Sequence, residues 1–484
     1  MGLARIERWL PEIYLAVALA VTGTLCLVTA PFFAPDEPNQ SCRAIALSHG
    51  GLIAEIGPVE AGARIDAGAF RAMDEMADIR MRWEKERGTK NVHDRPWGPL
   101  TDDEQTRLAG IRWARKTVFV PFSNTAAYPP MLYLPAMAGW RAAESLNLTI
   151  FWSLRLVRLL CALTAVGLGW WALRMCPALD RRSAGWMLLP FLLLPSTLFL
   201  NASCSQDAAL LGVAALIAAT LSRVLAAGRE FTGGELAAMA AMLAMCGAAR
   251  PPNAAIALVL FLPGVETAGR GWRRWIGPAT AFAAVVAVCG AWRYAVRDVG
   301  FEWSDEAEPE LQAAFLRAHP LASAWAMVHG TVAEVRDFAQ RGVYVVGWND
   351  LLPHHGAAAV LVVCLAAMLL FGPRVVIRTG RGWAVLSLAV ALPLLGISLA
   401  EYVIWTPPGF GTVYGIQPRY WLPMMPLATM LAMGRLRIGG EQLRAWGLLA
   451  AATGLAALAC TLPWFAAHAF YREGLARVLE LNLR

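Results

Sequence analysis

Two neighbouring acids, Asp36 and Glu37, directly follow the first long apolar run and stand between Pro35 and Pro38. A carboxylate at such a place can act as a general base or bind a cation, and the flanking prolines limit where the side chains point. Charged side chains at a membrane border can also simply be solvated. Because acids beside hydrocarbon are costly, however, the pair predicts a functional site.

Five further clusters combine a potential ligand with proline, glycine or an aromatic residue near the end of an apolar run. They are NTAAYPPMLYLP at 124–135, NASCSQD at 201–207, AARPPN at 248–253, GWNDLLPHH at 347–355 and YGIQPRYWLP at 414–423. One such cluster is commonly a helix cap or an anchor at the membrane interface. Together with the acidic pair on the same predicted face, they predict a pocket that opens to that side.

The composition is typical of an all-α polytopic membrane protein. The chain has 484 residues, of which 57% are hydrophobic and 16% charged. Several apolar runs approach the length of about 20 residues that spans a bilayer. The formal charge of +7 would suggest nucleic acid in a soluble protein, but much of the arginine lies in short loops between apolar runs. We therefore expect a lipid bilayer around the chain and no nucleic-acid partner.

Apolar runs predict about eleven membrane spans with a cytoplasmic N-terminus. The runs are 10–33, 153–173, 184–200, 206–226, 235–248, 252–265, 274–296, 355–371, 382–405, 420–434 and 445–468. Alternate loops carry arginine clusters, all on the side of Arg5 and Arg8. Because positive loops stay in the cytoplasm, the polar clusters are predicted to face the opposite, periplasmic side of the membrane.

These spans divide the chain into six segments. They are a first span at 1–33, a periplasmic subdomain with the acidic pair at 34–152, a transmembrane bundle at 153–296, a second periplasmic segment at 297–354, a C-terminal bundle at 355–468 and a tail at 469–484. Both periplasmic segments contain an amphipathic helix pattern. In 64–87 the apolar stripe is Phe70, Met73, Met76, Ile79 and Trp83, and 319–342 has Pro320 in its first turn. We expect these helices to lie on the membrane or to pack on the bundle.

Four quoted segments carry a family resemblance. APDEPNQSCRAIALSHG, YPPMLYLPAMAGW, GWNDLLP and GIQPRYWLPMMPL resemble signature segments of the bacterial membrane family catalogued as domain of unknown function 2142, which is similar to the glycosyltransferase-C superfamily. The resemblance spans about residues 10 to 435. It implies a multi-span bundle in the bacterial inner membrane, with a large first periplasmic loop and an acidic site just after the first span. Gln40 and Arg250 depart from the pattern, where a histidine and a lysine are expected.

The resemblance also implies a reaction. Members of the superfamily typically transfer a sugar from a polyprenyl-phosphate carrier to a periplasmic glycan, lipid or protein. The chain carries no Gly-rich phosphate loop, HExxH, GxSxG or CxxC motif, so we expect it to use a gradient, a preactivated substrate such as this donor, or no energy source at all. No cofactor is established, and a divalent cation would be compatible with the acids.

This reaction suggests roles for the polar residues. Asp36 is the preferred general base on the resemblance, with Glu37 as the alternative. Arg43, Arg250 and Arg419 are candidates for the phosphate, because guanidinium binds it bidentately. The other predicted substrate-binding residues are Tyr128, Tyr133, Asp207, Asp350, Gln417 and Tyr420. Asp207 and Asp350 could orient an acceptor or bind a cation. The aromatic rings could hold a sugar or an isoprenoid, and interface anchoring is an equal alternative for them.

Two other classes of function compete with the transferase. A transporter or flippase for a lipid-linked envelope precursor would explain the proline-rich break in CGAARPPN, since transporters use discontinuous helices. The two halves of the chain lack evident internal symmetry, however, and the polar clusters gather on one face instead of the midplane. A non-catalytic membrane scaffold would leave the polar pocket unexplained.

The predicted topology can be tested by labelling. A single cysteine introduced near Asp102 should react with a membrane-impermeant thiol reagent in intact spheroplasts, because residues 60–120 are predicted to be periplasmic. Labelling that requires cell lysis would contradict the topology.

Overall fold

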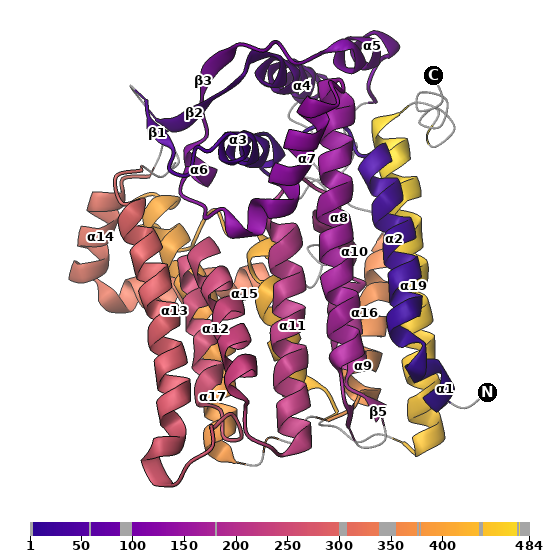
Figure 1. Ribbon diagram of the computed structural model, residues 1–484, viewed down its shortest axis with the longest axis vertical. Coiled ribbons are helices and arrows are strands. Elements are labelled where there is room, and N and C mark those ends of the chain that lie inside the picture. Colours follow the sequence, from indigo (N-terminus) through magenta and orange to yellow (C-terminus); the bar gives the residue numbers. More distant parts are fainter. Residues whose placement is uncertain are drawn as a thin grey trace.

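The structure is a computed structural model that describes residues 3–57, 60–87, 99–179, 182–299, 307–337, 355–374, 377, 379–434, 439–471 and 474. Asp350, one of the predicted site residues, lies outside the described residues. Figure 1 shows two layers: a bundle of roughly parallel and antiparallel helices, and a smaller cap that covers one end of the bundle.

Most elements belong to the bundle. They are α1 (Leu3–Arg8), α2 (Leu10–Val28), α8 (Ile150–Met175), β4 (Ala178–Leu179), β5 (Arg182–Ser183), α9 (Gly185–Leu192), α10 (Pro195–Asn201), α11 (Gln206–Ala227), α12 (Gly233–Ala249), η2 (Pro251–Phe261), η3 (Gly271–Trp275), α13 (Ile276–Ala295), α14 (Pro309–Ala318), α15 (Pro320–Asp337), α16 (His355–Phe371), α17 (Gly380–Ile404), η5 (Pro418–Tyr420), η6 (Leu422–Met424), α18 (Met425–Ala432) and α19 (Glu441–Phe470). Strands β4 and β5 form a small hairpin.

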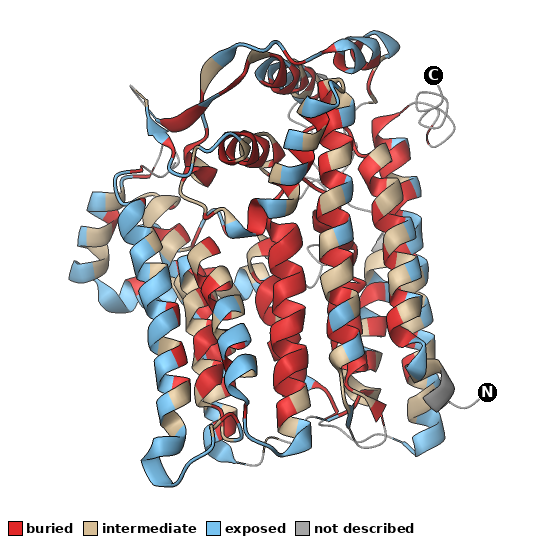
Figure 2. Cartoon of the chain, viewed as in Figure 1, coloured by how far each residue is buried: buried red, intermediate tan, exposed pale blue. Residues whose placement is uncertain are grey.

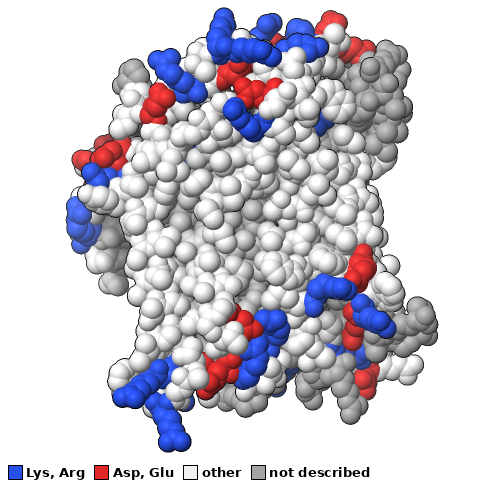
Figure 3. Space-filling model, in the orientation of Figure 1, with Lys and Arg blue, Asp and Glu red and all other residues white. Residues whose placement is uncertain are grey.

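Within the described residues, six helical segments are long and apolar enough to cross a membrane: Leu10–Val28, Ile150–Met175, Gln206–Ala227, Gly271–Ala295, Gly380–Ile404 and Glu441–Phe470. Figure 3 shows the matching surface, in which charged side chains gather at the two ends and a broad uncharged belt lies between them. Such a belt fits the hydrocarbon layer of a bilayer. The chain is therefore a membrane protein with several spanning helices.

The other predicted spans are shorter or broken. Gly233–Ala249, Pro251–Phe261, Gly356–Phe371 and Leu422–Ala432 are apolar but short, so the count of eleven stays a prediction. Residues 184–200 do not form one helix, because α9 ends at Leu192 and α10 begins anew at Pro195. Proline cannot donate the backbone hydrogen bond that a continuous helix would need there.

The cap is built from residues between α2 and α8. Its elements are α3 (Glu37–Ser48), β1 (Glu55–Ile56), β2 (Ala61–Asp66), α4 (Ala67–Arg87), α5 (Asp102–Gly110), β3 (Thr117–Pro121), α6 (Ser123–Ala126), η1 (Met131–Tyr133) and α7 (Leu134–Ser145). The strands form an antiparallel sheet in the order β1-β2-β3, with Gly62 opposite Pro121 and Asp66 opposite Thr117. The sequence reading did not predict this sheet.

The first amphipathic pattern is a helix, but it begins at Ala67, because the preceding residues pair in β2. Its stripe of Met73, Met76, Ile79 and Trp83 is buried, whereas Phe70 is 38% exposed. The second pattern forms α15, which begins at Pro320 as predicted and packs against α17.

Helix α11 is the centre of the bundle. Figure 2 shows it buried along nearly its whole length, whereas α13 at the margin is largely exposed. The N-terminus of α11 points at the cap, as do the C-terminal ends of α2, α12 and α17 (Figure 1). The chain therefore brings the polar clusters that follow or precede these helices to one end of the bundle.

Candidate functional site

Glu37 is the most deeply embedded acid of the predicted set, with a side chain that is 0% exposed. It accepts two hydrogen bonds from Arg158 of α8, Nε to Oε1 at 2.8 Å and Nη2 to Oε2 at 2.5 Å. Backbone amides of Cys204 at 3.0 Å and Ala34 at 3.3 Å also donate to it. A carboxylate with these partners is held in place on all sides.

Arg158 extends this contact to the end of the first span. Its Nη1 donates to the carbonyl of Thr29 at 2.8 Å, and its Nη2 to that of Ala30 at 2.9 Å. The pair thus joins the C-terminal end of α2, the first turn of α3, the middle of the chain around Cys204, and α8. Glu37 is placed as a connector of the bundle and the cap.

Asp36 lies differently although it is the next residue. It precedes α3 with a left-handed backbone, φ 55° and ψ 14°, and its side chain does not cap the helix. Left-handed backbone is strained for residues other than glycine, although aspartate tolerates it better than most. The carboxylate instead pairs with Arg419 and is 18% exposed. Arg419 also donates to the carbonyl of Pro35 at 3.2 Å, so the turn is held around this arginine.

The electrostatic environment keeps Arg419 charged. Burial alone would lower the pKa of its guanidinium, but the negative charge of Asp36 outweighs burial and holds the pKa above its ordinary value. Arg419 is therefore a permanent cation at the cap end of the bundle.

A second ion pair lies beside the first. Arg250, which follows α12, donates from Nη2 to Oδ1 of Asp207 at 2.6 Å. Asp207 stands in the first turn of α11, where its amide donates to Ser205 at 3.0 Å. The Cζ atoms of Arg250 and Arg419 lie 4.7 and 5.3 Å from the ring centroid of Tyr420. Both guanidinium groups therefore lie close to the same ring.

Glu401 is a third acid that sequence reasoning missed. It lies near the end of α17, is 8% exposed, and feels the charges of Arg250, Arg419 and Asp36. Gly415 packs against it: a Cβ at this position would lie 2.7 Å from Oε2 of Glu401, and the backbone φ is +85°. Only glycine fits this close approach without strain.

Several buried polar atoms around the two ion pairs have no hydrogen-bond partner among the described residues. They are Oδ2 of Asp207, Nη1 of Arg250, Nε of Arg419, Oε2 of Glu401 and the side-chain oxygen and nitrogen of both Gln206 and Asn253. Leaving such a group unsatisfied costs about 1–3 kcal/mol. Buried polar groups in folded proteins are nearly always satisfied, so this concentration is best explained by a bound polar group or water.

Two predicted residues make structural contacts instead. Arg43 donates to the carbonyls of Tyr128, Gly51 and Leu52, at 2.7 Å, 3.3 Å and 2.9 Å. Burial lowers the pKa of Arg43 to about 10. Tyr133 is fully buried and donates to Oε1 of Gln40. Both residues therefore hold parts of the cap to one another, and neither hydrogen-bonds to the side chains of the two ion pairs.

Tyr128 and Gln417 lie at the margin of the cluster. Burial raises the pKa of the Tyr128 phenol, and the charges of Arg250, Asp36 and Asp207 act on it. Gln417 is half-buried, and its carbonyl accepts a hydrogen bond from the amide of Tyr420 at 3.0 Å. The structure therefore gathers Asp36, Tyr128, Asp207, Arg250, Arg419 and Tyr420, which come from five of the predicted clusters.

Arg158 and Glu401 both had a signal in the sequence. Each is a charged residue inside an apolar run, at 153–173 and 382–405. Charges in such runs face protein partners or a polar cavity. Across the described residues, no group of three His, Cys, Asp or Glu side chains is arranged to hold a metal ion. Arg250 and Arg419 are two cations of this cluster.

Comparison with known proteins agrees with the membrane fold. Residues 19–428 match the family described as a predicted membrane protein, DUF2142. No curated protein and no solved structure matches the chain.

Removing one partner of the Glu37–Arg158 pair should destabilise the whole protein. Arg158→Met leaves a buried carboxylate uncompensated, and we expect the free energy of unfolding to fall by about 3–5 kcal/mol. The double variant Glu37→Gln/Arg158→Met should recover part of this loss. Thermal unfolding in detergent, followed by tryptophan fluorescence, measures both.

The exposed pair between Arg174 and Glu12, 2.8 Å long at the other end of the bundle, is the matched control. Arg174→Met should cost at most about 1 kcal/mol. Equal stability of Arg158→Met and Arg174→Met would contradict the role given to Glu37 and Arg158.

Proposed function

The chain belongs to the DUF2142 family of predicted membrane proteins, and we propose that it is a membrane glycosyltransferase. Its donor is a sugar linked to a polyprenyl phosphate, and its acceptor is a periplasmic glycan, lipid or protein. The observation that carries the proposal is the cluster of two buried arginines, two buried acids and the partly exposed Asp36 where the bundle meets the cap. A phosphate on an isoprenoid anchor could reach this place from the bilayer.

Arg250 and Arg419 would bind the donor phosphate. Nη1 of Arg250 and Nε of Arg419 are buried and have no partner in the described part of the chain. Guanidinium groups bind phosphate through charge-assisted, often bidentate hydrogen bonds. Tyr420, which stacks near both cations, keeps them at one side of the cluster.

The proposed reaction forms one bond and breaks one. The oxygen of an acceptor hydroxyl bonds to the anomeric carbon of the sugar, while the bond between that carbon and the phosphate oxygen breaks. The electron pair leaves with the phosphate, whose negative charge the two arginines stabilise. Asp36 takes the acceptor proton. Because the phosphate competes with Asp36 for Arg419, donor binding frees the carboxylate oxygen for this step.

The sugar itself would contact the uncommitted polar atoms. Gln206 and Asn253 each offer a donor and an acceptor, while Asp207 and Glu401 each offer a free carboxylate oxygen. Sugar hydroxyl groups both donate and accept, so they can satisfy such a mixed set. This arrangement suits a neutral polyhydroxylated group better than a second anion.

A transporter or flippase is the second candidate. Helix α12 ends at Ala249 and η2 begins at Pro251, so the helix is interrupted at the charged residue Arg250. Discontinuous helices of this kind carry substrate sites in transporters. Transfer of isotope from a polyprenyl-phosphate-linked sugar to an acceptor by the purified protein supports the transferase. Accumulation of the lipid-linked sugar in the opposite leaflet of proteoliposomes, without transfer, supports the flippase instead.

Asp36→Asn should reduce transfer by roughly 10²–10⁴-fold, the usual contribution of a positioned base. The amide keeps the size of the side chain but cannot take the proton. The unfolding temperature should fall less than in Arg158→Met, since Asp36 is 18% exposed and its amide can still accept a hydrogen bond from Arg419, whereas Glu37 is fully buried. Asp298→Asn is the matched control, because Asp298 is an exposed acid after α13 at the same end of the bundle. Full activity of Asp36→Asn would remove Asp36 from the chemistry.

Arg419→Lys should weaken transfer less than Arg419→Ala, because lysine keeps the charge and loses only the bidentate geometry. Binding of radiolabelled polyprenyl phosphate to the detergent-solubilised protein should follow the same order. Arg297→Ala, at an exposed position next to Asp298, should bind like the unchanged protein. Normal binding by both Arg419 variants would leave Arg250 as the remaining candidate for the phosphate.

A further inference from the structure

A basic hollow lies in the cap, away from the site described above. Its volume is about 650 Å³, and it is formed by the start of α4, the end of α5 and the segment that leads into β3. Figure 1 places α4 and α5 at the top of the cap, on the side turned away from the bundle. A ligand would thus reach the hollow from the aqueous phase, not from the bilayer.

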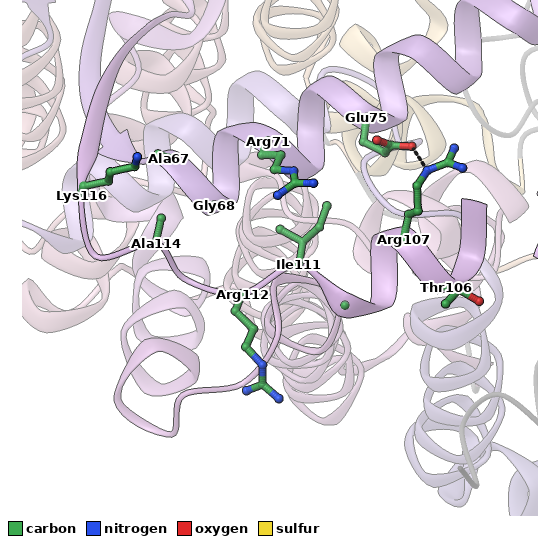
Figure 4. A pocket seen from close by; sticks show the side chains of 11 residues that line it. Ala67, Gly68, Arg71, Glu75, Thr106, Arg107, Ile111, Arg112, Ala114 and Lys116 are labelled. Carbon is green, nitrogen blue, oxygen red and sulfur yellow. Dashed lines mark hydrogen bonds and ion pairs between the residues drawn. The ribbon is translucent and has the colours of Figure 1, made fainter. Parts of the chain in front are cut away.

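The charge of the hollow is strongly one-sided. Arg71, Arg107, Arg112 and Lys116 line it, and Glu75 is the one acid in its lining. Glu75 is already paired with Arg107 at 2.7 Å. Figure 4 shows Lys116, Arg71 and Arg112 on different sides of the hollow, with the Arg112 side chain directed away from Arg71. Three exposed cations therefore line the hollow, and the one acid of its lining is bound to Arg107.

Asp66, the last residue of β2, holds together two of the segments that form the hollow. Oδ1 of Asp66 accepts from the amides of Gly68 at 2.7 Å and Ala114 at 2.9 Å, and Oδ2 accepts from that of Arg115 at 2.7 Å. Arg115 has a left-handed backbone, with φ 56°. Both oxygens of this carboxylate thus accept hydrogen bonds from backbone amides, and these bonds hold the segment 112–116 against α4. The negative charge of Asp66 lowers the positive potential of the hollow, but its hydrogen bonds leave the cationic side chains available.

We propose that this hollow binds an anionic segment of a glycan, one that carries carboxylate or phosphate groups. Arginine is suited to both groups through paired hydrogen bonds. Several cations spread over a hollow of this size match a ligand with more than one charge. The lining offers no large exposed apolar side chain, and the apolar anchors on which peptide recognition usually depends are therefore missing. Binding does not depend on the proposed transferase, but the glycan would be its acceptor if that function holds.

Binding can be measured on the full chain in nanodiscs of neutral phosphatidylcholine. The probes are a fluorescent galacturonic-acid oligomer and a glycerol-phosphate oligomer, with maltotetraose as the neutral control and an oligoglutamate peptide as the protein-like control. We expect at least one anionic glycan probe to bind, with an affinity that falls as salt rises. Maltotetraose should not bind, and oligoglutamate should bind more weakly.

The triple variant Arg71→Gln/Arg112→Gln/Lys116→Gln should weaken the binding by roughly tenfold or more, since several charge-assisted hydrogen bonds are lost. The matched control is Arg64→Gln/Lys85→Gln/Arg141→Gln, which removes the same charge from exposed cap positions outside the lining. Unfolding temperatures verify that both variants fold. Should the triple variant misfold, single substitution of Arg71 replaces it.

Three results would overturn the proposal: equal losses in the two variants, equal binding of maltotetraose, or stronger binding of oligoglutamate. None of these involves the lipid-linked donor. Failure here would therefore leave the proposed transferase standing, and inactivity toward lipid-linked sugars would leave the hollow intact.

Discussion

The buried ion pair between Glu37 and Arg158 is the constraint on which the arrangement of the candidate site depends. Both side chains are almost fully buried, at 0% and 1% exposure, and every strong donor and acceptor of the pair faces protein. The contact joins the first span, the cap and α8 through two residues that lie 121 positions apart in the sequence. Separating a buried charge from its partner is strongly destabilising. This junction therefore fixes where α3 begins and hence where Asp36 lies.

The two acids of the opening motif therefore divide into different roles. Glu37 points into the protein, with amides and a guanidinium on all sides, and has no free oxygen to offer a substrate. Asp36 turns outward through a left-handed backbone and meets Arg419 at the edge of the cluster. The inward acid supplies the geometry, and the outward acid is the one that we propose for the chemistry. Adjacent carboxylates thus need not act as a pair.

The fold was predictable in class and only partly in detail. Long apolar runs and the placement of arginine predicted a helical membrane protein with its polar clusters at one end, because these are properties of local sequence. The short strands of the cap could not be predicted, since Ala61–Asp66 gains its structure only from pairing with Thr117–Pro121. Pro190 and Pro195 indicate an interruption between α9 and α10, but the high hydrophobicity of the run favoured the prediction of one continuous span.

The candidate site, like the fold, could be predicted from the sequence only in part. Clusters far apart in sequence were expected to share a pocket, and Asp36, Asp207, Arg250 and Arg419 do meet. Which arginine pairs with which acid, however, is decided by helix packing over distances that the sequence does not encode. Arg43 was expected at the phosphate and instead holds backbone carbonyls of the cap. Arg158 and Glu401 were visible as charges in apolar runs, and only the fold shows that Arg158 pairs with Glu37 and that Glu401 lies near Arg250 and Arg419.

The central claim is that Arg250 and Arg419 hold a lipid-linked phosphate beside Asp36. An electron cryomicroscopy structure of the protein in nanodiscs with bound polyprenyl phosphate tests it most directly. We expect density for the phosphate within hydrogen-bond distance of both guanidinium groups, with the isoprenoid chain leading into the apolar belt. Density for the phosphate at another place, with the pairs of Arg250 and Arg419 unchanged, would contradict the claim.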